Sequence, residues 1–164
     1  MFGYFLKYFL TAIGLVFVLF ALGFLGVLFR LWPTSWPDEE IAITPDKMAR
    51  LTEMRKQSKF HETMRPFYPG ARSEPIRRDA ELRVNSVIDK LITGLSASPR
   101  KSFVLATFKP VLNDSTHFDS EERDQISEYF GQILEILGVE SSNELLNVWR
   151  YGLPYGWLQP KSRT

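Results

Sequence analysis

Cysteine is absent from the 164-residue sequence, which excludes disulfide bonds and thiolate metal sites. Histidine occurs twice, as His61 and His117, and no ligand-spacing motif connects the two, so we expect no metal and no cofactor. A glycine-rich phosphate loop, a nucleophile elbow and a His-Glu-x-x-His motif are also missing. We therefore expect no catalytic residues, no enzymatic activity and no small-molecule substrate.

The basic residues are not interleaved with aromatic side chains, so a nucleic-acid partner is not expected either. The formal net charge is only +1, yet the charges are unevenly distributed. Residues 47–109 contain 14 Lys and Arg against 6 Asp and Glu, whereas residues 110–150 contain 2 against 9. Two explanations remain open. The halves neutralise each other by packing together, or the domain presents surfaces of opposite charge to charged partners.

Charge is missing altogether from residues 8–29, YFLTAIGLVFVLFALGFLGVLF. A helix of this length spans about 33 Å, enough to cross a bilayer core of about 30 Å. Lys7 and Arg30 border the run, and aromatic residues flank both ends as they do at membrane interfaces. A cleaved signal peptide is the alternative, but its apolar region usually has only about 7–15 residues. We therefore predict an uncleaved transmembrane helix over residues 8–30.

The sequence before this helix, residues 1–7, is very short. A short amino-terminal segment is typical of a signal anchor whose following domain is exported. We predict a single-pass inner-membrane protein with its amino terminus in the cytoplasm and its remaining residues outside. The apolar run has no Gly-x-x-x-Gly pair, so it gives no strong signal for helix dimerisation.

Two stretches after the membrane segment have clear helical signals. Thr44 as N-cap and Pro45 as first helical residue predict a helix that continues to about Met64. Apolar residues recur at helical spacing through residues 74–95, which predicts a helix facing the core. These apolar positions are Ile76, Ala80, Val84, Val87, Ile88, Leu91, Ile92 and Leu95.

The next two segments are also predicted to be helical. Residues 102–112 alternate like a strand, but an isolated strand would have no partner, so we predict a helix that Pro110 kinks or ends. Asp119 and Glu122 form the pattern of a capping box, which predicts the start of another helix. Gly138 is placed to end that helix.

A second capping-box pattern, from Ser141 to Glu144, predicts a short helix that ends at Gly152. The fold class is therefore all-α, with one N-terminal transmembrane helix followed by a small domain of about four to five helices. The predicted organisation is a tail over 1–7, the transmembrane helix over 8–30, a linker over 31–43, a helical soluble domain over 44–152, and an aromatic and proline-containing tail over 153–164.

Residues 118–152 contain the successive motifs DSEER, YF, ILGV, SS, LLN and WRYG. In these motifs the sequence resembles a family of small uncharacterised bacterial domains of unknown function. The resemblance implies an α-helical domain and a bacterial protein, and therefore the bacterial inner membrane as its location. It implies no activity, because the matching residues are mostly helix caps and core positions.

Two functions without catalysis fit these features. One is a membrane-tethered domain that binds another protein, such as an immunity or inhibitor protein at the cell envelope. The other is a structural accessory subunit of a membrane complex. The expected partners are the bilayer and an unidentified protein. Aromatic and arginine side chains dominate interface hot spots, so Arg150, Tyr155 and Trp157 are the candidate partner-binding residues.

Overall fold

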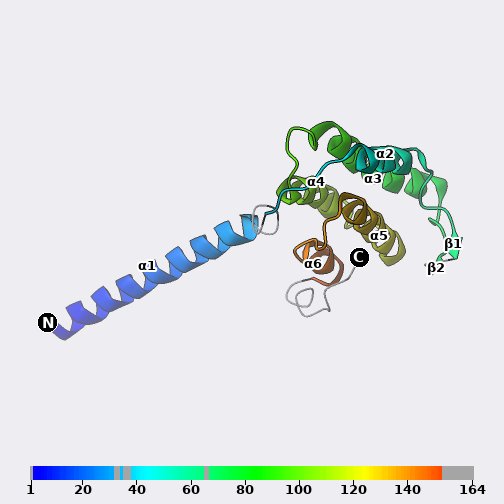
Figure 1. The fold of residues 1–164 in the computed structure, drawn as a ribbon. Coiled ribbons are helices and arrows are strands. Elements are labelled where there is room, and N and C mark those ends of the chain that lie inside the picture. The colour runs from blue at the N-terminus through cyan, green and yellow to red at the C-terminus, as the bar shows by residue number, and fades with distance from the viewer. Residues whose placement is uncertain (1, 32–33, 35–37, 65–66, 153–164) are drawn as a thin grey trace. The chain divides into compact units, whose positions relative to one another are not determined.

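The computed structural model describes residues 2–31, 34, 38–64 and 67–152, and the chain divides into two compact units, residues 1–32 and 33–164 (Figure 1). The first unit is helix α1 (Phe2–Leu31), so the predicted tail continues the same helix. Among the described residues, its segment Lys7–Val27, with a mean hydropathy of 2.6, is the one helical stretch apolar and long enough to cross a membrane.

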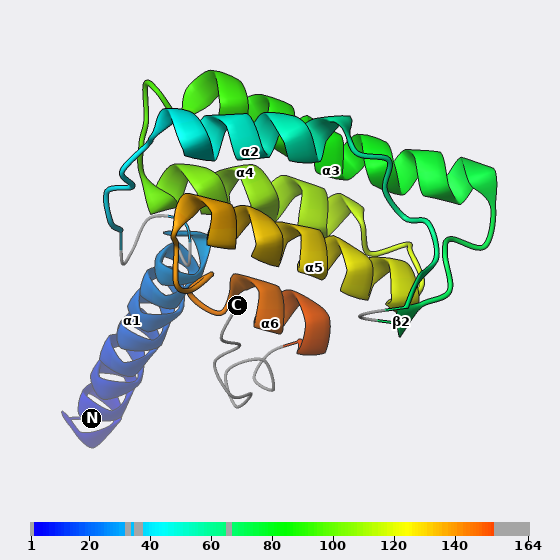
Figure 2. The same ribbon diagram turned by 45° about the vertical axis from the view of Figure 1, so that its right-hand side comes forward.

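The second unit confirms the predicted all-α class, with five helices and one short hairpin among its described residues. The elements are α2 (Pro45–Lys56), β1 (Thr63–Met64), β2 (Phe67–Tyr68), α3 (Glu74–Gly94), α4 (Lys101–Asp114), α5 (Ser120–Leu137) and α6 (Leu145–Tyr151). Helices α2, α3, α4 and α5 lie side by side, and α6 packs against α4 and α5 (Figure 2). The antiparallel hairpin pairs Thr63 with Tyr68 and Met64 with Phe67.

The core lies where the apolar stripes of these helices meet. Most of the predicted stripe of α3 is buried, while Ile76 and Ile92 are partly buried, and Leu91 is fully inaccessible. Ile133 of α5 is also fully buried, and the rings of Phe108 and Phe130 stack with centroids 4.3 Å apart between α4 and α5. Helical periodicity therefore identified the surfaces that hold the domain together.

Helix α2 begins as predicted but ends earlier. The Thr44 hydroxyl accepts a hydrogen bond from the Lys47 N–H at 3.3 Å, and Pro45 is the first helical residue. The helix ends at Lys56, so the predicted continuation to Met64 is wrong. The physical reason is Lys59, whose buried Nζ donates to the carbonyl oxygens of Met54 at 2.6 Å and Gln57 at 2.9 Å. These bonds satisfy carbonyls that the helix leaves unpaired at its end.

Residues 102–112 are helical as predicted, within α4, but Pro110 does not end the helix. Its exposed ring lies on the outer side, while Val111 and Leu112 are buried and hold the last turn against the core. Before α4, the Ile41 N–H donates to the Pro99 carbonyl oxygen at 2.8 Å. The end of the predicted linker therefore packs against the loop that precedes α4.

Helix α5 ends as predicted, at Gly138, whose φ of 73° lies in the left-handed region that glycine adopts without strain. Neither predicted capping box forms. Asp119 occupies the N-cap position of α5, but its side chain makes no capping hydrogen bond. Helix α6 begins at Leu145 with Glu144 as N-cap at a φ of 67°, and it ends at Gly152.

Candidate functional site

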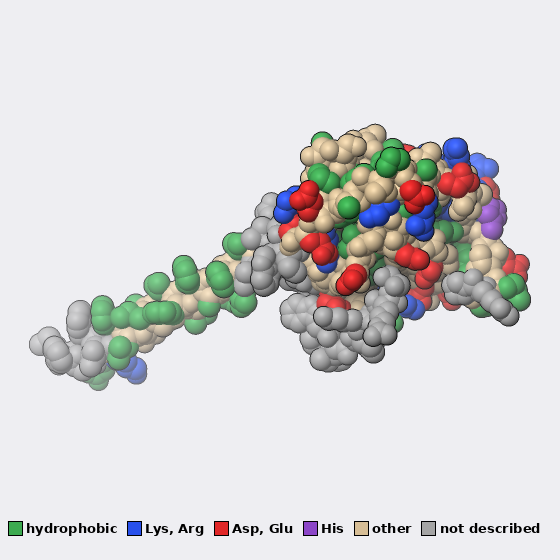
Figure 3. All heavy atoms as spheres, in the orientation of Figure 1, with side chains coloured by type: hydrophobic (Ala, Val, Ile, Leu, Met, Phe, Trp, Pro, Cys, Tyr) green, Lys and Arg blue, Asp and Glu red, His purple; other side chains and the backbone are tan. Residues whose placement is uncertain are grey.

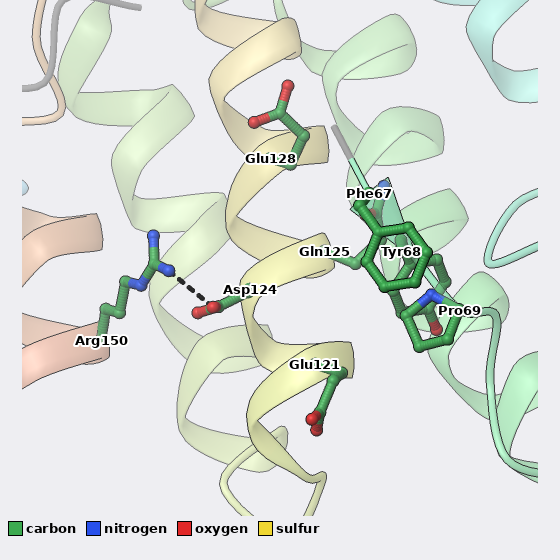
Figure 4. A pocket seen from close by; sticks show the side chains of 8 residues that line it. All are labelled: Phe67, Tyr68, Pro69, Glu121, Asp124, Gln125, Glu128 and Arg150. Atoms are coloured by element: carbon green, nitrogen blue, oxygen red, sulfur yellow. Dashed lines mark hydrogen bonds and ion pairs between the residues drawn. The ribbon is translucent and has the colours of Figure 1, made fainter. Parts of the chain in front are cut away.

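A groove with a volume of about 420 Å³ lies between the hairpin and the first half of α5 (Figure 4). Strand β2 and the residue after it form one wall, α5 forms the other, and α6 contributes an arginine at the rim. The lining residues are Phe67, Tyr68, Pro69, Glu121, Asp124, Gln125, Glu128 and Arg150.

The chain between α2 and the hairpin positions the first wall. Phe60 has a φ of 61°, which is unusual for a residue other than glycine and reverses the chain direction. Its N–H donates to the Tyr129 hydroxyl of α5 at 3.2 Å, and its carbonyl oxygen accepts from the Ala71 N–H at 3.2 Å. The first bond fastens the start of the hairpin segment to α5, and the second joins the two ends of the segment to each other.

The hairpin presents apolar side chains to solvent. Adjacent strand residues point to opposite faces, so Tyr68 is only 3% exposed while Phe67 is 72% exposed. Met64, paired with Phe67 across the hairpin, is 75% exposed. Two large apolar side chains that are exposed to solvent side by side are typical of an interaction surface.

The opposite wall is acidic. Glu121, Asp124 and Glu128 follow the i, i+3, i+7 spacing that places residues on one helix face. Hydrogen bonds from its own backbone N–H and from Ser120 lower the pKa of Glu121, so this carboxylate is charged at neutral pH. Within the described part of the chain, no Lys or Arg pairs with Glu121 or Glu128.

The ion pairs show how far the basic half, residues 47–109, and the acidic half, residues 110–150, neutralise each other. Among the described residues, Arg72–Asp119 at 2.9 Å joins a Lys or Arg of the basic half to the acidic half, whereas pairs such as Arg55–Asp89 lie within one half. Acidic and basic side chains are interspersed on the face drawn in Figure 3. In the acidic wall of the groove, Asp124 is paired with Arg150, whereas Glu121 and Glu128 form no ion pair with a described Lys or Arg.

Of the three partner-binding residues predicted from the sequence, the structure describes only Arg150. Arg150 lies at the rim of the groove, where its Nη2 donates to Asp124 Oδ2 at 2.5 Å and its guanidinium carbon lies 5.3 Å from the Tyr151 ring centroid. Tyr155 and Trp157 lie outside the described residues. Sequence reasoning missed Phe67 and Met64, because strands of two residues have no detectable period.

A second pocket, with a volume of about 390 Å³, lies where the start of α3 meets the α4–α5 loop and the first turn of α5. Its lining residues are Pro75, Ile76, Asp79, His117, Phe118, Asp119 and Glu122. Glu122 is 2% exposed and forms no hydrogen bond or ion pair with the described residues. The predicted capping role of Glu122 does not account for this burial.

The histidines lie apart and are both exposed. His61 Nε2 lies 2.7 Å from Ser58 Oγ, and His117 Nε2 lies 3.4 Å from Asp79 Oδ2. Among the described residues, no group of three or more His, Asp and Glu side chains is arranged to hold a metal ion.

The structure is therefore a small helical domain, with a groove and a second pocket on its surface, that follows an exposed apolar helix. The chain belongs to the family of the domain of unknown function DUF4844, whose model matches residues 42–154. This confirms the resemblance to a family of unknown function and extends it well beyond residues 118–152.

A solved structure has a similar fold. It is the crystal structure of a DUF3571 family protein from Acinetobacter baumannii AYE, with 25% sequence identity and a TM-score of 0.59. The match covers 68% of the present chain and 94% of that protein's chain. No curated protein matches the sequence.

Proposed function

We propose that this protein is a single-pass protein of the bacterial inner membrane whose helical domain binds another protein outside the cytoplasm. The support for an anchor is α1, in which every side chain that the structure describes is exposed and no charge lies between Lys7 and Arg30. An apolar helix without a protein partner is stable in lipid, where its backbone bonds are satisfied internally.

The observation that carries the binding function is the groove between the hairpin and α5. It combines the exposed Phe67 with the carboxylates of Glu121 and Glu128, which form no ion pair with a described Lys or Arg. An aromatic side chain beside negative charges suits a partner that presents both basic and apolar side chains. One form of this proposal is an immunity or inhibitor protein that masks a toxin or hydrolase at the envelope, and the proposal includes no catalysis.

The membrane part is tested by topology and by processing. Alkaline phosphatase fused after Thr164 should be active, because that enzyme folds only outside the cytoplasm. The protein should stay in the membrane after alkaline extraction, with its amino terminus intact by mass spectrometry. Activity only from a cytosolic reporter would reverse the orientation, and a shortened mature protein would identify a cleaved signal sequence.

The binding part is tested by site-specific photo-crosslinking in cells. A photoreactive amino acid at Phe67 should crosslink one partner, and the same amino acid at Leu82 should not. Leu82 is a matched control because it is 66% exposed on α3, away from the groove. Alanine at Arg150, Tyr155 or Trp157 should weaken the Phe67 crosslink. Crosslinks from α1 but none from Phe67 would instead favour a structural accessory subunit.

A further inference from the structure

The second pocket has an imbalance of charge. Three carboxylates line it, from Asp79, Asp119 and Glu122. Asp79 is paired with Arg83, whose Nε lies 3.2 Å from Oδ2, and Asp119 is paired with Arg72 at 2.9 Å. The carboxylate of Glu122 is left without a compensating cation among the described residues.

The burial of Glu122 makes this imbalance costly. A buried carboxylate normally has hydrogen bonds or a charge partner, because burial removes its hydration. The Tyr68 hydroxyl nearby is also buried without a hydrogen-bond partner, and burial together with the Glu122 charge raises the pKa of Tyr68. Among the described residues, the Tyr68 hydroxyl therefore has no hydrogen-bond partner and the Glu122 carboxylate has no ion-pair partner, although Glu122 stands in the first turn of α5, where the helix N-terminus favours a negative charge.

Apart from His117, which lies 3.4 Å from Asp79, the remaining lining residues of the pocket are apolar. Pro75 and Ile76 stand in the first turn of α3, and Phe118 lies directly before α5. A ligand that satisfies both features carries one positive charge at the end of a short hydrocarbon chain. A hard metal ion does not suit the apolar walls, because it requires several converging oxygen ligands.

We propose that this pocket binds an alkylammonium group, with the ammonium at the Glu122 carboxylate and the alkyl chain against Ile76 and Phe118. The site is separate from the groove between the hairpin and α5, so it goes beyond the proposed protein-binding function. The same group occurs in two sources, a lysine side chain of a peptide and a free alkylamine.

Binding is tested by titration calorimetry on the full-length protein in phosphatidylcholine nanodiscs, whose lipids carry no net charge. Nα-acetyl-lysine amide represents the peptide source, and pentylamine represents the free amine. Nα-acetyl-norleucine amide and pentanol are their uncharged analogues. Binding of at least one amine, tighter than its analogue, supports the proposal, and the tighter of the two amines identifies the source. Failure of both amines to bind at millimolar concentration, or equal binding of the analogues, overturns it.

Variants then test the role of Glu122. Glu122→Gln keeps the shape of the side chain and should weaken amine binding roughly tenfold or more, because the ammonium loses its charged partner. Glu135→Gln makes the same change at an exposed position near the end of α5 and should leave the affinity unchanged. Unchanged affinity in Glu122→Gln overturns the proposal.

A second measurement requires no variant and covers the case in which Glu122→Gln does not fold. Amide resonances of the wild-type protein are followed by NMR during the amine titration. Shifts concentrated at Ile76, Phe118 and Glu122 support the site, and shifts confined to other regions overturn it. Neither experiment involves the Phe67 crosslink, so the failure of one proposal leaves the other standing.

Discussion

Helices α1 and α3 are both long, and each contains many large apolar side chains, but α1 is far more apolar overall and the two differ completely in burial. Ile13 is the least exposed of the large apolar side chains described in α1, and it is still 40% exposed. In α3, Val84, Ile88 and Leu91 are fully buried, while Arg78 and Leu82 face solvent. The helix with the higher hydrophobic content is therefore the exposed one, and the less apolar helix supplies the core. The spacing of the polar residues decides which helix enters the core, because only a helix with a polar face can lie at the surface of a bundle.

The largest effect is expected from the bundle core. Leu91→Ala and Ile133→Ala should each lower the free energy of unfolding of the domain by about 2–5 kcal/mol, because each removes fully buried methyl groups and leaves a cavity. Leu19→Ala in α1 is the matched control and should leave domain unfolding unchanged. Chemical denaturation followed by near-ultraviolet circular dichroism measures all three. Changes below about 0.5 kcal/mol at both core positions would contradict the assigned core.

The next largest effect is expected in α1, where a substitution should impair membrane insertion and the matching substitution in α3 should not. Phe17 lies at the middle of the apolar segment and is 71% exposed. Phe17→Arg should disfavour membrane insertion by about 2.5–3.5 kcal/mol, because it places a charge at the bilayer centre. The measurement is the fraction of protein that remains in membranes after alkaline extraction. Arg at Leu82, which is similarly exposed on α3, should not reduce that fraction.

These two helices were predictable from the sequence because their signals are local and long. Gly138 was predictable for a related reason, since a glycine after an amphipathic stretch can adopt the positive φ that ends a helix. The same local reasoning failed for Glu122. A capping box explained its position in the sequence, but Glu122 is buried and lines a pocket together with Pro75, Ile76 and Asp79 of α3, which sequence spacing does not predict.

The groove was less predictable than the helices. Arg150 was selected from its aromatic neighbourhood, whereas Phe67 and Met64 depend on a hairpin with two residues in each strand. That hairpin follows the early end of α2, where the buried Lys59 bonds the carbonyl oxygens of Met54 and Gln57, and a lysine in a polar stretch normally indicates a solvated face. The tertiary role of this lysine has no signal in the local sequence.

Lys59 provides a prediction of intermediate size. Lys59→Met should cost about 1–3 kcal/mol at pH 7, because the carbonyls of Met54 and Gln57 lose their donor. Burial lowers the pKa of Lys59 below its ordinary value of 10.5. Between the lowered folded pKa and 10.5, the unfolded chain binds more protons, so the stability contributed by Lys59 increases with pH.

The measurement is the difference in unfolding free energy between wild type and Lys59→Met at pH 7 and at pH 10. The difference should widen in favour of the wild type at the higher pH. Other titrating groups occur in both proteins and cancel. A difference that shrinks would mean that the ammonium form is the one that stabilises the fold.

The smallest effect on stability is expected at Phe67. Its neighbour in β2, Tyr68, allows an exposed and a buried aromatic residue to be compared directly. Phe67→Ala should change the free energy of unfolding by less than about 0.5 kcal/mol, because its ring is 72% exposed. Tyr68→Ala, at a side chain that is 3% exposed, should cost about 3–5 kcal/mol. Crosslinking from a photoreactive residue at Met64 should nevertheless be lost in Phe67→Ala. An exposed phenylalanine whose removal harms neither folding nor partner capture would leave the hairpin without a role in binding.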